Sequence, residues 1–380
     1  MKNFRAKLLC LKGYYFFSAL VFYAPVALFI RTSRGVSISE FFILQAILSF
    51  FIFIFEIPFG MITDKIGYKN SIVISHFSML LARIILLFSF CFEFFVLESV
   101  LEAVSIALES GTISGYEYEI IGEENFAEKT SVLGNYSTIG FIISTISFYF
   151  INNYFEQNFL IIFTIISTFI SFLFALFFEK EKIIEKSDNN KFRFKSILNT
   201  KLIVFMIFNG IISITFILIN FFYVVILQNI KLSENYMTFI ILLYSAVGLL
   251  SPKIIKIFGE TKLKRNLFIF LSASSILFIS LISIKSIFVI IPMCCLPMLI
   301  GVIETYFLKV ENQYVDNLNE KNRATILSTF SMGANFVDVG FLLVSSKLSE
   351  TSLDYSFIFI SILLLIFSLF FITTKFIKEN

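Results

Sequence analysis

Seven polar side chains recur every three or four residues within one apolar stretch, a spacing that places them on one face of a helix. They are Glu98, Glu102, Ser105, Glu109, Thr112, Tyr116 and Glu119. An ionised side chain at the centre of a bilayer costs about 2.5–3.5 kcal/mol, so such residues usually line a cavity or contact a partner. We expect Glu102 and Glu109 to face a polar cavity, and Glu98 and Glu119 to lie at the membrane interfaces. Burial favours the neutral form of a carboxylate, which suits a proton carrier.

Arg83 lies deep in another apolar stretch and is the obvious ion-pair partner for these carboxylates. A structural pair between Arg83 and Glu102 or Glu109 is the alternative to a transport role for the two acids. Because the deep acids outnumber Arg83, a cavity that they line would favour cations or protons. His76 is the single histidine and begins an apolar stretch, so it is expected at the interface. The further cavity candidates are Asn135, Asn209, Glu304 and Asp338.

The elements that must position these residues are membrane-spanning helices. Of the 380 residues, 58% are hydrophobic and 15% are charged, whereas soluble domains average about 25% charged. The apolar residues form blocks of about 20 residues, the length that a helix needs to cross a bilayer. Only helices and closed barrels satisfy their backbone groups in lipid, and these blocks lack the alternation of barrel strands. The sequence therefore predicts an all-α membrane protein.

Twelve spans are predicted, arranged as two pseudo-symmetric halves of six. The halves are residues 1–178 and 202–380, and a charged cytoplasmic linker at 179–201 joins them. Twenty-four of the 30 Lys and Arg residues lie on the side of the N-terminus. The positive-inside rule then places both termini in the cytoplasm. The expected spans are 8–30, 38–61, 71–92, 96–120, 130–151, 158–178, 202–228, 235–257, 266–284, 287–309, 324–345 and 356–374.

A short loop after the second predicted span carries a spaced set of glycine and charged residues: Gly60, Asp64, Gly67 and Lys69. Gly67 can adopt the positive φ of a tight return, and Gly60 would allow helices to approach closely. The spacing resembles the loop signature of the major facilitator superfamily. That resemblance implies the twelve-helix fold, in which Asp64 would latch the two halves in the outward-open state. It also implies that Gly60, Gly67 and Lys69 shape the turn, and that the fourth span faces the cavity.

Two further motifs are similar to those of a bacterial exporter-like subgroup. One is Ser110-Gly111-Thr112 followed by Tyr118-Glu119, and the other is Arg323-Ala324-Thr325 at the start of the eleventh span. The sequence departs from the subgroup at Ser114, where an acidic residue is usual. It also lacks the Gly-Pro pair of drug–proton antiporters in the fifth span. These departures count against proton antiport as the coupling mode.

The predicted function is that of a secondary active transporter in a bacterial cytoplasmic membrane. The leading interpretation is proton-coupled efflux of a small amphipathic or cationic solute by rocker-switch alternating access. Import of a nutrient by proton symport is the alternative, and a non-transporting membrane sensor is a third. No metal-ligand spacing, phosphate-binding loop or Ser/His/Asp set indicates an enzyme. The expected partners are the solute, protons and membrane lipids, with no nucleic acid and no cofactor, and the chain is expected to be a monomer.

Overall fold

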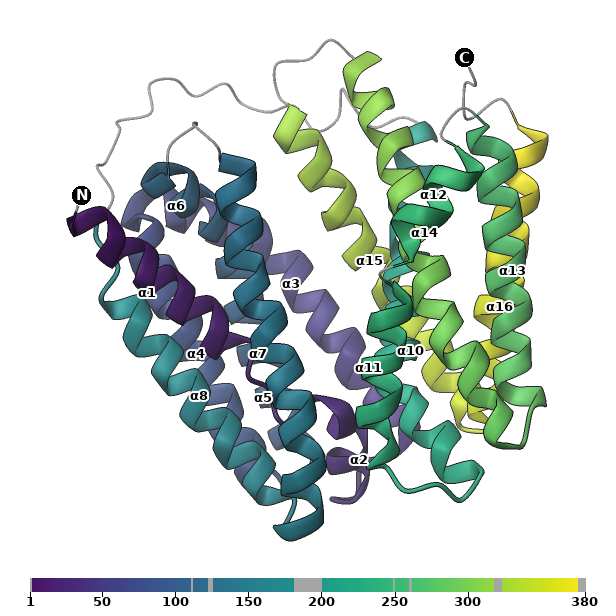
Figure 1. The fold of residues 1–380 in the computed structure, drawn as a ribbon, viewed down its shortest axis with the longest axis horizontal. Helices are drawn as coiled ribbons and strands as arrows, with labels where there is room; N and C mark the ends of the chain where they lie inside the picture. The colour runs from purple at the N-terminus through teal and green to yellow at the C-terminus, as the bar shows by residue number, and fades with distance from the viewer. Residues whose placement is uncertain are drawn as a thin grey trace. The chain divides into compact units, whose positions relative to one another are not determined.

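The described part of the chain is entirely helical, as the sequence predicts. It separates into two compact units, one formed by Met1–Val36 and Ile47–Phe192 and the other by Ser37–Ala46 and Arg193–Asn380 (Figure 1). We call them unit 1 and unit 2 and describe each by itself. The computed structural model describes residues 2–110, 112–121, 126–180, 200–248, 250–259, 262–317 and 323–374.

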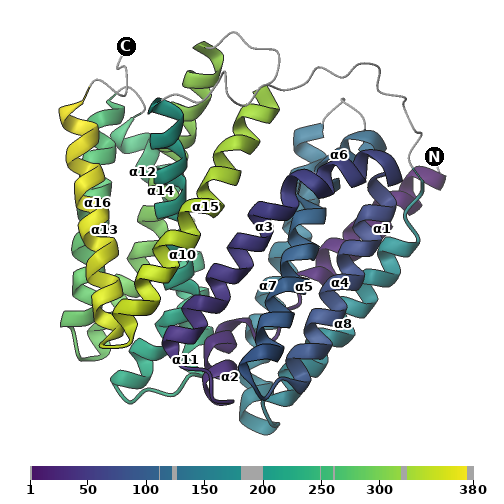
Figure 2. The same cartoon turned by 180° about the vertical axis from the view of Figure 1, so that it is seen from behind.

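Unit 1 is built around the neighbouring helices α4 and α5, with α8 against α4 and with α1 against α7 and α8 (Figures 1 and 2). Gly67 separates α3 from α4 with a φ of 89°, a value that glycine adopts without steric cost. The helices of unit 1 are α1 (Lys2–Ser18), η1 (Ala24–Val26), α2 (Ala27–Thr32), α3 (Ile38–Ile66), α4 (Tyr68–Phe88), α5 (Phe92–Glu109), α6 (Thr112–Ile121), α7 (Phe126–Tyr154) and α8 (Asn158–Leu176).

The first turns of α3 belong to unit 2 rather than to unit 1. Phe42 stacks on Phe222 of α10 with ring centroids 4.5 Å apart, and the Ser39 hydroxyl lies 2.8 Å from that of Ser346 in α15. These contacts explain why the start of α3 groups with the C-terminal part of the chain.

Unit 2 pairs α10 with α15 and α13 with α16. The α10–α15 contact is close, because a Cβ atom at Gly210 would lie 2.6 Å from Val337. In the α13–α16 contact, Ser275 and Ser361 each donate a hydrogen bond to the other's carbonyl oxygen. The helices are α10 (Thr200–Asn229), α11 (Tyr236–Gly248), α12 (Ser251–Phe258), α13 (Leu263–Ser283), η2 (Ile287–Val289), α14 (Ile290–Asn317), α15 (Arg323–Ser349) and α16 (Leu353–Thr373).

Two predicted spans are interrupted rather than continuous. The first breaks between Ser18 and Ala24, just before Pro25. Proline suits the first turn of a new helix because it has no N–H to donate within a helix. The fourth breaks after Glu109, because Ser110 leaves the helical region with a ψ of 118°. A single helix over 96–120 is therefore wrong, and the acidic stripe is divided between α5 and α6.

In the described residues, eight helical segments are long and apolar enough to cross a membrane. Large apolar side chains also point outward from them, including Phe77, Phe169 and Ile276. Such exposed apolar surface is unusual for a soluble protein. The eight segments are Ile38–Ile66, Tyr68–Phe88, Asn158–Leu176, Thr200–Asn229, Tyr236–Phe258, Leu263–Ser283, Ile287–Glu311 and Leu353–Thr373.

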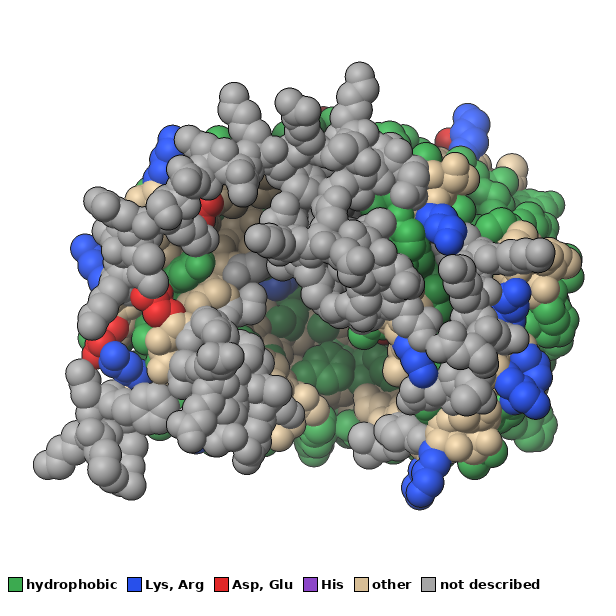
Figure 3. Space-filling view, turned by 90° about the horizontal axis from the view of Figure 1, so that it is seen from above, with side chains coloured by type: hydrophobic (Ala, Val, Ile, Leu, Met, Phe, Trp, Pro, Cys, Tyr) green, Lys and Arg blue, Asp and Glu red, His purple; other side chains and the backbone are tan. Residues whose placement is uncertain are grey.

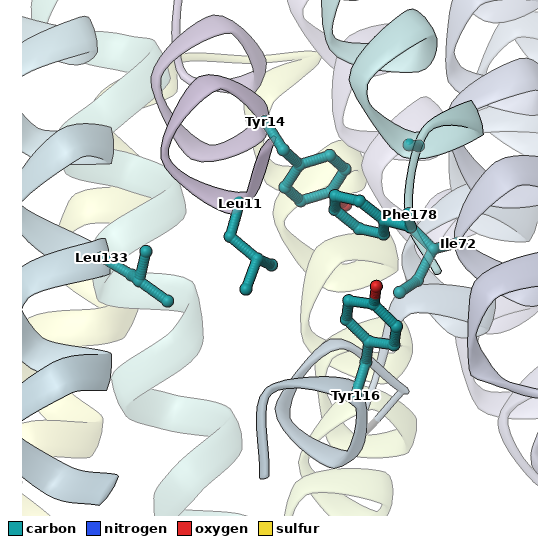
Figure 4. Close-up of a cluster of buried hydrophobic side chains, with 7 residues drawn as sticks. Leu11, Tyr14, Ile72, Tyr116, Leu133 and Phe178 are labelled. Atoms are coloured by element: carbon teal, nitrogen blue, oxygen red, sulfur yellow. The ribbon is translucent and has the colours of Figure 1, made fainter. Parts of the chain in front are cut away.

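One apolar cluster in unit 1 brings together α1, α4, α6, α7 and α8 (Figure 4). The Tyr116 ring stacks on Phe178 with centroids 4.8 Å apart, and the Tyr14 ring lies 5.3 Å from the same phenyl ring. Tyr14 is fully buried. The cluster therefore fixes the position of the Tyr14 hydroxyl among the helices around it. Its members are Leu11, Tyr14, Ile72, Tyr116, Leu133, Ala175 and Phe178.

Candidate functional site

Much of the buried polar structure of unit 1 lies along the contact between α4 and α5. The Ser75 hydroxyl donates to the carbonyl oxygen of Ser105 at 2.9 Å and lies 3.0 Å from the Ser105 hydroxyl. The Ser78 hydroxyl donates to the carbonyl oxygen of Leu101 at 2.8 Å. These bonds hold α4 against the helix that carries Glu98, Glu102 and Glu109.

Glu109 ends α5 and belongs to a chain of three polar side chains from three helices. The Tyr14 hydroxyl in α1 donates to Glu109 Oε1 at 2.7 Å. The same hydroxyl lies 3.2 Å from Nδ1 of His76 in α4. His76 is only 4% exposed, so other side chains enclose it, and its depth in the membrane stays a prediction. A buried imidazole requires hydrogen-bond partners, and Tyr14 supplies one.

Glu98 is also buried. One oxygen lies 2.6 Å from a guanidinium nitrogen of Arg31, and the two side chains are 1% and 7% exposed. Arg31 also donates to the carbonyl oxygen of Ala27 at 2.9 Å. The ion pair explains how a carboxylate lies inside the unit, because burial of an unpaired charge is far more costly.

Arg83 is not the ion-pair partner of the α5 carboxylates that the sequence predicted. Its guanidinium lies over the Tyr23 ring, 5.0 Å from the centroid, and its side chain is buried. Among the described residues, no ion pair joins Arg83 to Glu102 or Glu109. A cation over an aromatic face is favourable, so Tyr23 supplies the contact that a carboxylate was expected to supply. Glu102 is half-buried on α5, one turn after Glu98.

The loop residues lie at the end of α3 and the start of α4. Asp64 and Gly60 are exposed within their unit, and Lys69 is half-buried. Within the described residues, a Cβ atom at Gly60 would meet no other atom within 4 Å. The prediction that Gly60 permits close helix approach stays a prediction, whereas Gly67 has the positive φ of a tight return. The latch role of Asp64 stays a prediction.

In unit 2 the contacts of α10 with α14 and α15 bring two buried carboxylates close to α10. The Ser213 hydroxyl donates to Asp338 at 2.6 Å, and Asn209, one turn earlier, donates to Glu311 at 2.6 Å. Asp338 is 2% exposed and Glu311 is 6% exposed. Glu304 lies outside this group and is exposed.

The structure thus divides the predicted site residues into two sets. Arg83, Glu102 and Glu109 lie along α4 and α5 in unit 1, and Asn209 and Asp338 lie along α10 and α15 in unit 2. Asn135 is exposed on α7 and joins neither set. Residue 111 and the side chains of Ser114, Tyr118 and Arg323 lie outside the described residues, as does most of the predicted linker.

Sequence reasoning missed five residues that the structure adds to these sets: Tyr14, Arg31, His76, Glu98 as a buried group, and Glu311. The sequence did offer a signal for a buried His76, because it is the single histidine and it lies within an apolar stretch. For Glu311 no signal was available, because it follows the predicted end of the tenth span at 309, whereas α14 continues to Asn317.

A surface cavity of about 320 Å³ lies among the ends of α10, α13 and α16. Its polar lining residues include Asn229, Lys285 and Asp354. It contains no residue of either set, so it is separate from the buried carboxylates.

The all-helical fold, the apolar spans and the buried charged groups define a multi-pass membrane protein. The profile of the Major Facilitator Superfamily matches residues 13–336. The chain belongs to this superfamily of transporters, and it is not an enzyme. A search of curated protein sequences found no significant match.

Solved structures agree on the fold. The nucleoside transporter NupG superposes with a TM-score of 0.77 at 14% identity, over 96% of this chain and 98% of the other. A variant of the same transporter gives a TM-score of 0.78 at 15% identity, over 96% and 99%. A D-xylose–proton symporter gives 0.73 at 11% identity, over 99% and 98%. At these identities the likeness establishes the fold alone.

The Arg31–Glu98 pair gives the first prediction. Arg31→Met leaves Glu98 buried without its cation, which we expect to destabilise the protein by about 3–5 kcal/mol. The double variant Arg31→Met/Glu98→Leu should recover most of that loss, because neither charge remains. Thermal unfolding of the purified protein in detergent measures both changes.

The exposed pair Lys347–Glu350 provides the control, and Glu350→Gln should leave the unfolding temperature nearly unchanged. Equal stability of Arg31→Met and the wild-type protein would contradict the assignment of a buried pair.

Proposed function

We propose that the chain is a proton-coupled secondary transporter that exports a small amphipathic or cationic solute by alternating access. The observation that carries the proposal is the position of Glu109. This carboxylate ends α5 inside a transporter fold, and the Tyr14 hydroxyl of another helix donates a hydrogen bond to it. A carboxylate in an apolar environment is suited to bind and release a proton during transport.

The charges inside the two units support a cationic solute or protons. In the described residues, the buried acidic side chains are Glu98, Glu117, Glu311 and Asp338. The buried basic side chains are Arg31 and Arg83, with His76 titratable. Glu102 and Glu109 add two half-buried acids, so the interior has an acidic balance.

We further propose twelve spans in two halves, residues 1–178 and 202–380, with the linker at 179–201 and both termini in the cytoplasm. In unit 2, exposed or half-buried Lys and Arg residues lie between the start of α12 and the start of α13. Lys and Arg side chains are also visible on the face viewed in Figure 3. Such clustering is typical of the cytoplasmic ends of spans. The proposed location is a bacterial cytoplasmic membrane.

Efflux rests on the resemblance of Ser110-Gly111-Thr112 and Arg323-Ala324-Thr325 to exporter motifs. Import by proton symport uses the same fold, and one of the similar structures is named a proton symporter. In either direction, Asp64 is the proposed latch residue of the alternating-access cycle, and the chain works as a monomer.

The second prediction concerns Glu109. In proteoliposomes with an imposed pH gradient, Glu109→Gln should reduce solute movement to the rate of protein-free liposomes, because Gln cannot release a proton. The solute panel contains organic cations, hydrophobic drugs, nucleosides and sugars. Movement of a radiolabelled solute is measured with and without the gradient.

Glu93→Gln is the matched control, because Glu93 is an exposed acid at the start of the same helix. It should transport like the wild-type protein. Full gradient-driven transport by Glu109→Gln would remove this carboxylate from the mechanism.

The third prediction tests orientation at the two ends of α13. Lys262 precedes this helix and Lys285 follows it, and both side chains are exposed. In a background with the four cysteines replaced by serine, Lys285→Cys should react with a membrane-impermeant thiol reagent added to intact cells. Lys262→Cys should react only after the membrane is opened. The reverse pattern would invert the proposed topology.

A further inference from the structure

In unit 1 the hydroxyl of Tyr14 connects two titratable side chains, Glu109 and His76. Tyr14 lies 2.7 Å from Glu109 Oε1 and 3.2 Å from His76 Nδ1. Both distances are within the range of protein hydrogen bonds. A tyrosine hydroxyl has one proton, so it can donate to only one of the two partners at a time.

We propose that Glu109, Tyr14 and His76 form a proton relay, in which a proton passes between Glu109 and His76 through the Tyr14 hydroxyl. The relay rests on the proposed function, which already assigns proton binding to Glu109. It adds His76 as a second proton-holding group and Tyr14 as the group that connects the two.

The transfer balances without any further reactant. In one state Glu109 is ionised and His76 is an imidazolium, with Nδ1–H donating to the Tyr14 oxygen and Tyr14 O–H donating to Glu109. The Nδ1–H bond breaks as a new O–H bond forms on Tyr14, and the old Tyr14 O–H bond breaks as an O–H bond forms on Glu109. Glu109 and His76 are then both neutral, with the imidazole proton on Nε2.

The packing around Tyr14 holds the hydroxyl in place while its proton moves. Ile72 of α4, Leu133 of α7 and Phe178, two residues after the end of α8, belong to the same apolar cluster as Tyr14 (Figure 4). The His76 ring lies against the Tyr14 ring, with centroids 4.5 Å apart. Apolar surroundings keep water from competing for the two hydrogen bonds, which strengthens them.

In the described part of the chain, the ionisable groups around the relay include side chains of α1 and α6. Glu117 of α6 and the neighbouring Tyr15 act electrostatically on Tyr14, and Tyr15 forms a hydrogen bond with Glu117. On the α7 side, Lys12 lies 5.2 Å from the ring centroid of Tyr136. Just after α8, the contact is the phenyl ring of Phe178.

The charge of Glu109 acts on His76 whether or not a relay exists, so a relay is distinguished by a proton exchange rate that depends on the Tyr14 hydroxyl. In a relay, the two groups titrate as one coupled system and show two steps. The distinction is measurable, because His76 is the only histidine in the chain. Its ring nitrogens give NMR signals that need no further assignment.

The experiment is a pH titration of ¹⁵N-histidine-labelled protein in lipid nanodiscs, purified with a tag that contains no histidine. Protons are the only ligand added. The wild-type ring shifts should follow two steps, one for each titrating group. Glu109→Gln should give a single step, because it removes the second proton site. Tyr14→Phe should keep both sites but slow the exchange of the ring proton, measured from exchange broadening of the ring-nitrogen signals, because it removes the connecting hydroxyl.

Tyr14→Phe keeps the ring that packs against Phe178, so the helices should stay in place. Tyr136→Phe is the matched control, because it removes a tyrosine hydroxyl in the same unit outside the relay, and it should keep both steps and the wild-type exchange rate. A single step in the wild-type protein, or an unchanged exchange rate in Tyr14→Phe, would overturn the relay. Failure of the proposed function would show separately, as absence of gradient-driven transport by the wild-type protein.

Discussion

Ionisable side chains inside an apolar helix bundle need partners, because the bundle and the lipid offer them no bulk water. Each unit meets this requirement with contacts between helices that are distant in sequence. Arg31 reaches Glu98 from α2 to α5, Tyr14 reaches Glu109 from α1 to α5, and Ser213 reaches Asp338 from α10 to α15. The polar contacts therefore specify which helices are neighbours, in addition to the apolar packing around them.

The interruption of the fourth predicted span follows the same logic. Glu109 is the last residue of α5, and α6 begins at Thr112. A carboxylate at this end of a helix lies at the negative end of the helix dipole, which favours a hydrogen-bond donor nearby. Tyr14 is that donor. The break thus gives Glu109 an environment different from that of Glu98, whose charge is met by an arginine.

The sequence contained enough information for the helical class and the superfamily. Apolar blocks depend only on local composition, and the loop around Asp64 is a local motif. The partners of Glu109 could not be predicted in this way, because Tyr14 and His76 come from separate helices. No spacing in the sequence connects them to Glu109. Arg31 lies near Arg34 and Gly35, so it looked like a loop residue, although α2 carries it into the interior. Arg83 was matched to the wrong partner because sequence patterns do not show that Tyr23 faces it.

The central claim is that the protonation of one buried carboxylate controls the movement of the two halves. Pulsed electron spin resonance measures this directly, with spin labels at Glu156→Cys and Lys285→Cys in a cysteine-free background. These are exposed positions, one in each unit. The account predicts two distance populations whose ratio changes with pH, and a ratio that no longer changes when Glu109→Gln is added. A single distance distribution that is the same at every pH would contradict it.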